Sequence, residues 1–163
     1  MRLLIVAVGL VGVVACGTGP TPLSNTHDSA EALAAAVLDA FAAGDAERLR
    51  GLAVSEQEFR QRVWPELPAA RPERNLPFSY VWGELRQKSE ASLTTLFAQH
   101  GGRPYALVAV RFGATTPYQT FTVRRDARFL VREAGGGERE LRLCGSLLEQ
   151  DGRWKVFSFV VDD

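Results

Sequence analysis

The sequence predicts an α+β domain in which N-terminal helices pack against an antiparallel sheet of four or more strands. Between residues 28 and 100, apolar side chains recur at the spacing of amphipathic helices. From Tyr105 onward they alternate with polar side chains, as in half-buried strands, and short turns separate the runs. Helices that precede a run of strands, rather than alternating with them, are typical of the α+β class.

Length and charge fit a single globular domain, which we assign to residues 28–163. The chain has 163 residues, of which 46% are hydrophobic and 23% charged, and this is enough to bury a substantial core. Its 19 basic and 19 acidic side chains give a formal net charge of zero. Nucleic-acid-binding domains usually carry an excess of basic residues, so we expect no nucleic-acid partner.

The first residues look like an export signal. Arg2 supplies one positive charge, and residues 3–15 then carry none. An uncharged run of this length matches the apolar part of a signal peptide and is too short to span a bilayer as a helix. It ends in Val-Val-Ala-Cys-Gly, which resembles the bacterial lipoprotein signal, with Cys16 as the residue that carries the lipid. A secretory signal that is cleaved nearby is the alternative.

The lipoprotein resemblance implies a location and a partner. Residues 1–15 would be the signal peptide, and acyl chains such as palmitate on Cys16 would attach the protein to a membrane of the bacterial cell envelope. Gly17, in place of an aspartate, favours the outer membrane, with the domain facing the periplasm. Residues 16–27 are rich in Gly, Pro, Ser and Thr, a composition that predicts a flexible tether.

Three short helices are expected to open the domain. The first follows a cap at Asp28 or Ser29, the second runs from residue 46 to about 52, and the third covers about 56–64. Gly44 ends the first, because glycine readily adopts the left-handed conformation that follows many helices. Asp45 caps the second. Ser55 and Glu58 form a capping box at the start of the third, and Pro65 ends it.

A proline-rich connection leads to a longer helix. Four prolines hold residues 64–77 in an extended, irregular path that we expect to pack over the domain. The long helix begins at Ser79 or Gly83 and ends at His100, before a Gly-Gly pair.

Four strands are expected to complete the domain, over residues 105–112, 121–132, 141–149 and 154–161. Turn sequences separate them, and Asp151-Gly152 is a strong hairpin signal. Short connections of this kind predict an antiparallel meander.

Two segments resemble the nuclear-transport-factor-2-like superfamily, which includes SnoaL-like proteins. Residues 37–49 look like its first helix with a Gly-Asp break, and residues 145–158 look like its last hairpin, with the sequence Asp-Gly-Arg-Trp-Lys-Val. The layout over residues 28–161 is also similar. The resemblance implies a cone-like fold, in which a curved sheet wraps around the helices and encloses a pocket. Because the superfamily includes isomerases, hydrolases, dehydratases and binding or dimerisation modules, it does not specify a function.

Five side chains are candidates for the wall of such a pocket: Trp82, Ser89, Arg111, Arg125 and Ser146. Ser89 lies on the apolar stripe of the long helix, so it marks either tight packing or a polar cavity wall. Arg111 and Arg125 share their strand phase with apolar neighbours, and an unpaired buried charge is costly. Each therefore needs an acid such as Glu84 or Glu90, or an anionic ligand, unless it lies at a sheet edge or a bend.

The sequence offers little for catalysis or metal binding. Two histidines and two cysteines are few for a His/Cys metal site, and no common nucleophile, phosphate-binding, dinucleotide or zinc motif occurs. Cys144 lies in an apolar run, which is typical of a buried, unreactive thiol. His100 fits a helix-end residue, and Asp126 fits a surface carboxylate beside arginines. We therefore expect no cofactor and no metal, and we assign no catalytic residue.

Three functions remain open, in order of preference. The first is a lipid-anchored, non-enzymatic module that binds a small apolar or anionic ligand, or a protein. The second is an accessory or assembly lipoprotein that acts as a homodimer or with another envelope protein. The third is a small isomerase- or hydratase-like enzyme, which would need an acid–base pair inside an apolar pocket.

Overall fold

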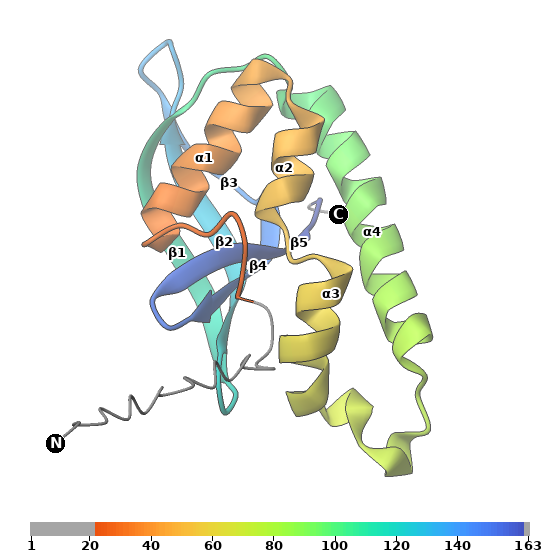
Figure 1. Ribbon diagram of the computed structural model, residues 1–163. Coiled ribbons are helices and arrows are strands. Elements are labelled where there is room, and N and C mark those ends of the chain that lie inside the picture. The colour runs from red at the N-terminus through yellow and green to blue at the C-terminus, as the bar shows by residue number, and fades with distance from the viewer. Residues whose placement is uncertain (1–21, 162–163) are drawn as a thin grey trace, which may run out of the picture.

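The computed structural model describes residues 22–161. The predicted signal peptide, Cys16 and the first part of the predicted tether lie outside these residues. The described chain consists of helices followed by an antiparallel sheet, so the α+β class is confirmed (Figure 1).

The α-helices of this part of the chain are α1 (Ala30–Ala43), α2 (Ala46–Leu52), α3 (Glu56–Glu58) and α4 (Phe78–His100). The local signals that predict their ends are present. Gly44 ends α1 in the left-handed region, with φ of 69°. The Asp45 side chain caps α2 by accepting the Arg48 N–H. α4 begins at Phe78, slightly before the predicted start, because Pro77 occupies its N-cap position.

The third helix is only partly α-helical. Ser55 and Glu58 form the predicted capping box, in which each side chain accepts the backbone N–H of the other residue. α3 then passes into a π-helical turn, Phe59–Val63, and a 3₁₀ turn, Trp64–Glu66. The predicted regular helix over residues 56–64 is therefore wrong in its second half. The proline at position 65 lies in the 3₁₀ turn that ends this helical path.

The strands are β1 (Ala106–Pro117), β2 (Thr122–Arg132), β3 (Glu138–Leu141), β4 (Cys144–Gln150) and β5 (Arg153–Phe159). They form one antiparallel sheet in the order β1-β2-β4-β5, and β3 pairs with the end of β2 that β4 leaves free. The predicted third strand, over residues 141–149, is thus two strands, with a break at residues 142–143.

The break coincides with a bend in β2 at Asp126. This residue has φ of 52°. Its carboxylate accepts a hydrogen bond from Nε of Arg128 at 3.3 Å and forms an ion pair with Arg142, whose Nε lies 3.1 Å away. On the neighbouring strand, a Cβ at Gly113 would lie 2.6 Å from an oxygen of Asp126, so only glycine lets β1 pass this closely. β4 pairs with β2 before the bend and β3 pairs with it after the bend.

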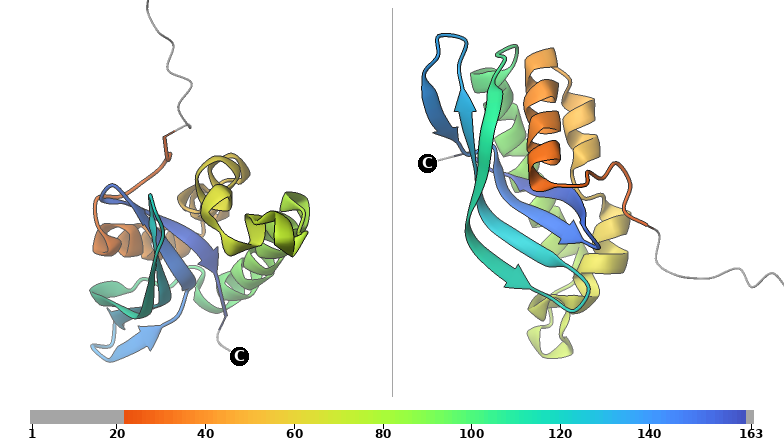
Figure 2. Two further views of the ribbon diagram at one scale, coloured as in Figure 1. Left: turned by 90° about the horizontal axis from the view of Figure 1, so that it is seen from below. Right: turned by 90° about the vertical axis from the view of Figure 1, so that its left-hand side faces the viewer.

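Apolar side chains are buried on both faces of β4 and β5. Leu147 and Val156 belong to a large cluster with α1 and α2. Their neighbours Leu148 and Phe157 pack with Phe59 in a second cluster. Because consecutive residues of a strand point to opposite faces, this part of the sheet lies between two helical layers (Figure 2). The second layer contains α3, the turns after it and the N-terminal half of α4.

Residues 22–27 pack against the domain. The backbone of His27 exchanges two hydrogen bonds with that of Trp154 in β5, at 3.1 and 2.8 Å. The backbone N–H of Ser24 donates to Glu58 at 2.7 Å, and Leu23 packs against the second apolar cluster. The described part of the segment predicted to be a tether, residues 22–27, therefore contacts the domain assigned to residues 28–163.

Candidate functional site

The main candidate is a pocket of about 390 Å³ between the sheet and the second helical layer, which we call the apolar pocket. Its lining residues are Phe59, Leu67, Val81, Leu85, Thr116, Tyr118, Val123, Arg125, Ser146 and Phe157. Most of these side chains are hydrophobic, and Arg125 is the charged one. This composition is typical of small-molecule sites, in which a few polar groups orient a ligand in an apolar cavity.

Glu66 fixes one end of the apolar pocket. Its carboxylate accepts the backbone N–H groups of Gln119 and Thr120, at 2.6 and 3.2 Å, in the turn between β1 and β2. Leu67 and Tyr118 are the neighbours of these residues and line the pocket. The contact therefore holds the 3₁₀ turns after α3 against the turn between β1 and β2, next to two lining residues of the pocket.

A second hollow, of about 480 Å³, adjoins the first, and we call it the polar pocket. Its lining residues are Gly113, Ala114, Arg125, Asp126, Arg142, Gly145, Ser146 and Ser158. Arg125 and Ser146 line both pockets and are direct partners in the pairing of β2 with β4. Strand pairing thus places two of the predicted site residues together at the junction of an apolar and a polar surface.

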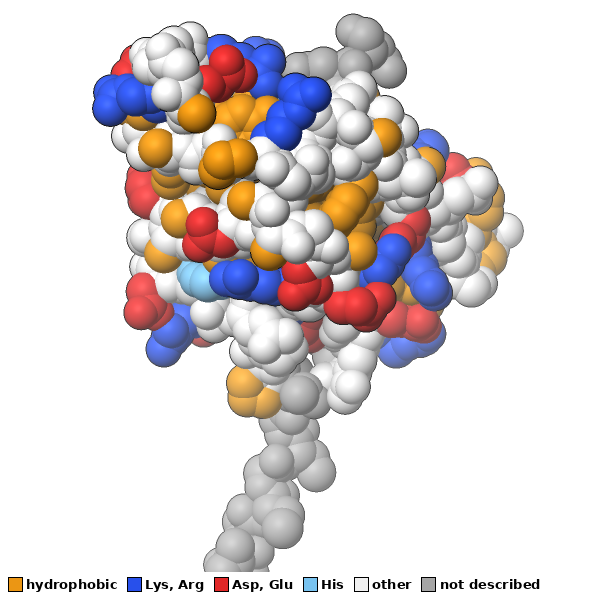
Figure 3. All heavy atoms as spheres, turned by 90° about the horizontal axis from the view of Figure 1, so that it is seen from above, with side chains coloured by type: hydrophobic (Ala, Val, Ile, Leu, Met, Phe, Trp, Pro, Cys, Tyr) orange, Lys and Arg blue, Asp and Glu red, His pale blue; other side chains and the backbone are white. Residues whose placement is uncertain are grey.

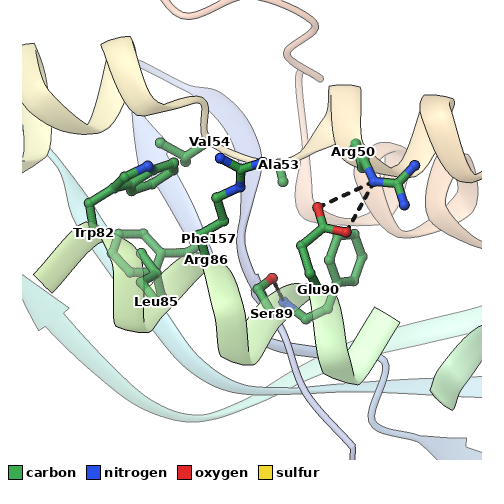
Figure 4. Close-up of a pocket in the computed structure, with 10 residues that line it drawn as sticks. Arg50, Ala53, Val54, Trp82, Leu85, Arg86, Ser89, Glu90 and Phe157 are labelled. Carbon is green, nitrogen blue, oxygen red and sulfur yellow. Dashed lines mark hydrogen bonds and ion pairs between the residues drawn. The ribbon is translucent and has the colours of Figure 1, made fainter. Parts of the chain in front are cut away.

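Trp82 and Ser89 line a third, smaller pocket of about 110 Å³ between α4, β5 and the end of α2 (Figure 4). Ser89 Oγ accepts the backbone N–H of Phe159 at 3.0 Å, so this serine joins α4 to β5. Leu85 and Phe157 line both this pocket and the apolar pocket and lie between them. At the rim, Nε of Arg50 and the carboxylate of Glu90 form an ion pair of 3.1 Å.

Arg111 lies apart from these pockets. Its guanidinium pairs with Glu140 of β3 at 3.0 Å, and its side chain is 63% exposed. The acids considered as its partners are engaged elsewhere, since Glu84 pairs with Lys88 and Glu90 with Arg50. Arg111 therefore does not share a pocket with Arg125. Strand phase alone did not reveal this, because it shows that two side chains share a face but not how far apart they lie.

The structure contains a buried ion pair that the sequence did not predict. Nζ of Lys155 lies 2.9 Å from a carboxylate oxygen of Glu58, and the two side chains are 1% and 4% exposed. The carboxylate also accepts from the backbone N–H groups of Ser24 and Ser55. Burial alone would raise the pKa of Glu58, but these N–H groups and the Lys155 ammonium lower it to about 2. Every oxygen of this carboxylate is thus engaged in holding the fold together.

Three other polar side chains occupy structural positions. Cys144 is fully buried, and burial raises the pKa of its thiol, which favours the unreactive protonated form. His100 lies against Phe41, and its Nδ1 is 3.1 Å from the Tyr105 hydroxyl. Burial, together with Arg139 and Arg103, lowers the pKa of His100. Asp126 forms the bend described above.

Charges of both signs are mixed on the face shown in Figure 3, with apolar side chains between them. Residues 22–161 contain no group of three or more His, Cys, Asp or Glu side chains that could hold a metal ion. Within the same part of the chain, the helices are too short or too polar to cross a membrane.

Comparison with known proteins finds no relative of this chain. No family model, no curated protein and no solved structure matches the chain.

Proposed function

We propose that the protein is a lipid-anchored component of the bacterial cell envelope whose domain binds a small molecule in the apolar pocket without transforming it. The observation that carries this proposal is the pocket itself. Its volume of about 390 Å³ lies in the range of small-ligand sites, and its wall combines apolar side chains with Arg125 and Ser146. The side chains that line it include neither a carboxylate nor a histidine that could complete an acid–base pair with Tyr118.

The binding proposal is tested on a chain of residues 17–163, which keeps every contact described above. We expect native mass spectrometry of this chain, purified from its natural host, to show a bound mass that is lost on denaturation. Val81→Trp, which fills the apolar pocket, should abolish the bound mass. Val108→Trp, the same change at an exposed position of β1, should leave it in place. A chain without ligand, or a bound mass that survives Val81→Trp, would contradict the proposal.

Anchoring rests on the sequence around Cys16. The lipoprotein-like signal supports acylation of this residue, the outer membrane as its location and a periplasmic orientation of the domain. Fractionation of cells that express the full chain tests this part. We expect the protein in the membrane fraction with incorporated palmitate, and Cys16→Ser should abolish the label and release the protein. Unchanged fractionation and labelling of Cys16→Ser would contradict lipid attachment at this residue.

A cone-like shape belongs to the same proposal. The bend at Asp126 supports it, because a bend in the longest strand pair turns one half of the sheet toward the helices. A crystal structure in which the helices lie inside the concave face of the sheet would establish the cone, and a sheet without such a concave face would exclude it.

One observation favours homodimerisation as a second candidate function. β1 is 12 residues long, lies at the edge of the sheet and has no further strand beside it within residues 22–161. It carries a single charged residue, Arg111, whereas edge strands of monomeric proteins are usually protected by charges, prolines or short length. Pairing of two β1 strands should give a dimer in analytical ultracentrifugation, and Val108→Lys should weaken it. A monomer at high micromolar concentration would exclude this function.

A further inference from the structure

We infer that the apolar and polar pockets form one site for a single-chain amphiphile with an anionic head group. This inference rests on the proposed binding function and specifies its ligand. The acyl chain would occupy the apolar pocket, and the head group would lie at Arg125 and Ser146, where the two pockets meet.

The two pockets adjoin at two shared lining residues. Arg125 and Ser146 lie opposite each other on β2 and β4 and line both hollows. A ligand whose chain fills the apolar pocket would place its other end at these two shared residues. The lining changes from apolar to polar at these two residues. The apolar pocket is lined by Phe59, Leu67 and Val81, among others. The polar pocket is lined by Asp126, Arg142 and Ser158, among others.

Arg125 supplies the charge that selects an anion. It is exposed and forms no ion pair with any residue from 22 to 161, although the neighbouring arginine, Arg124, pairs with Glu149 at 2.7 Å. The nearby carboxylate of Asp126 is already engaged by Arg142 and Arg128. The junction thus presents an uncompensated guanidinium, whose fork of N–H donors matches a carboxylate or a phosphate.

Neither a purely apolar ligand nor a small anion would suit both pockets. A purely apolar ligand would lie against Arg125 and remove water from part of its charge without replacing it, which is unfavourable. A small inorganic anion would leave the apolar wall in contact with water. A molecule with an apolar chain and one anionic end satisfies both surfaces, because burial of the chain provides most of the affinity and the charged end fixes the orientation.

The inference is tested by calorimetric titration of residues 17–163 with dodecanoate and with dodecanol, which has the same chain but no charge. We expect dodecanoate to bind at least about tenfold more tightly than dodecanol, which corresponds to one charge-assisted contact. Arg125→Gln should remove this difference by weakening dodecanoate binding alone. Arg111→Gln is the matched control, since Arg111 lies on the same sheet, is exposed and lines neither pocket, and it should change neither affinity.

The outcomes separate this inference from the function on which it rests. Equal binding of dodecanoate and dodecanol, or equal effects of Arg125→Gln and Arg111→Gln, would overturn the anionic head group but leave an apolar binding site. If Val81→Trp leaves the binding of both probes unchanged, the apolar pocket is not the site, and both the inference and the proposed function fail. Circular dichroism of each variant verifies that the fold is retained.

Discussion

Of the ion pairs in the described chain, the pair of Lys155 with Glu58 is the most deeply buried. Their side chains are 1% and 4% exposed, and removal of one partner leaves the other charged and buried. We expect Lys155→Met to lower the free energy of unfolding in urea by about 3–5 kcal/mol. Lys88→Met, which breaks an exposed pair with Glu84, should cost less than about 1 kcal/mol. Equal small losses would show that the buried pair contributes little.

Glu58 should also make the protein sensitive to acid. Its pKa is about 2 in the fold, below the ordinary value of about 4.3, so its stabilisation is complete above the unfolded pKa and is lost as the pH falls toward 2. The loss amounts to about 3 kcal/mol. Urea unfolding at a series of pH values should show this decline, and Glu58→Gln should flatten it.

His100 allows the assignment of this acid sensitivity to be checked. Burial lowers the pKa of His100, so its contribution is present above about 6.5 and declines as the pH falls below that value. The two groups thus act in different pH ranges. A loss of stability that begins below about pH 6.5 and does not continue as the pH falls toward 2 would point to His100 and contradict the assignment to Glu58.

The buried pair shows what the sequence could predict about single residues. The role of Glu58 in a capping box follows from its spacing to Ser55, because a helix start is a local structure. Its pairing with Lys155 joins residues 97 positions apart, and no local pattern reports such a contact. The same reason applies to Arg125 and Ser146, which were candidates individually but are brought together only by the register of β2 and β4.

At the scale of elements, substitution by alanine at two glycines should change the free energy of unfolding in opposite directions. A Cβ at Gly113 in β1 would lie 2.6 Å from an oxygen of Asp126, whose carboxylate two arginines hold in place. We expect Gly113→Ala to lower the free energy of unfolding by about 1–3 kcal/mol. Gly83 lies inside α4, where a Cβ would meet no atom within 4 Å, so Gly83→Ala should raise it by about 0.5–1 kcal/mol.

Urea unfolding of both variants measures these changes. If Gly113→Ala is as stable as the unsubstituted chain, β1 and β2 can separate at the bend without loss, and the close approach is not needed for the fold.

The strands illustrate why some elements were predicted and others were not. The hairpin at Asp151-Gly152 joins β4 to β5 as expected, because its signal lies in adjacent residues. The sequence does not predict the break between β3 and β4, because the break depends on the bend at Asp126. Gly113 of β1 and Arg142 of the break itself meet Asp126 there. Apolar and polar residues continue to alternate through such a bend, so the sequence pattern does not reveal it.

At the scale of the whole molecule, the N-terminal segment would link the proposed lipid anchor to the domain. Ser24 is held by Glu58, so a lipid on Cys16 would keep the domain close to the membrane, since the chain between these residues can span at most about 28 Å. If Cys16 carries the proposed lipid, the packing of residues 22–27 would determine which end of the domain lies nearest the membrane.

Removal of this segment should weaken the whole domain. A chain that starts at residue 28 loses both hydrogen bonds from Ser24 to Glu58, the two backbone bonds between His27 and Trp154, and the packing of Leu23. Water replaces part of these contacts, so we expect a loss of about 2–4 kcal/mol in urea unfolding. A chain that starts at residue 22 is the matched control and should be as stable as residues 17–163. If both truncated chains are equally stable, residues 22–27 lie on the domain without stabilising it, and the domain does start near residue 28.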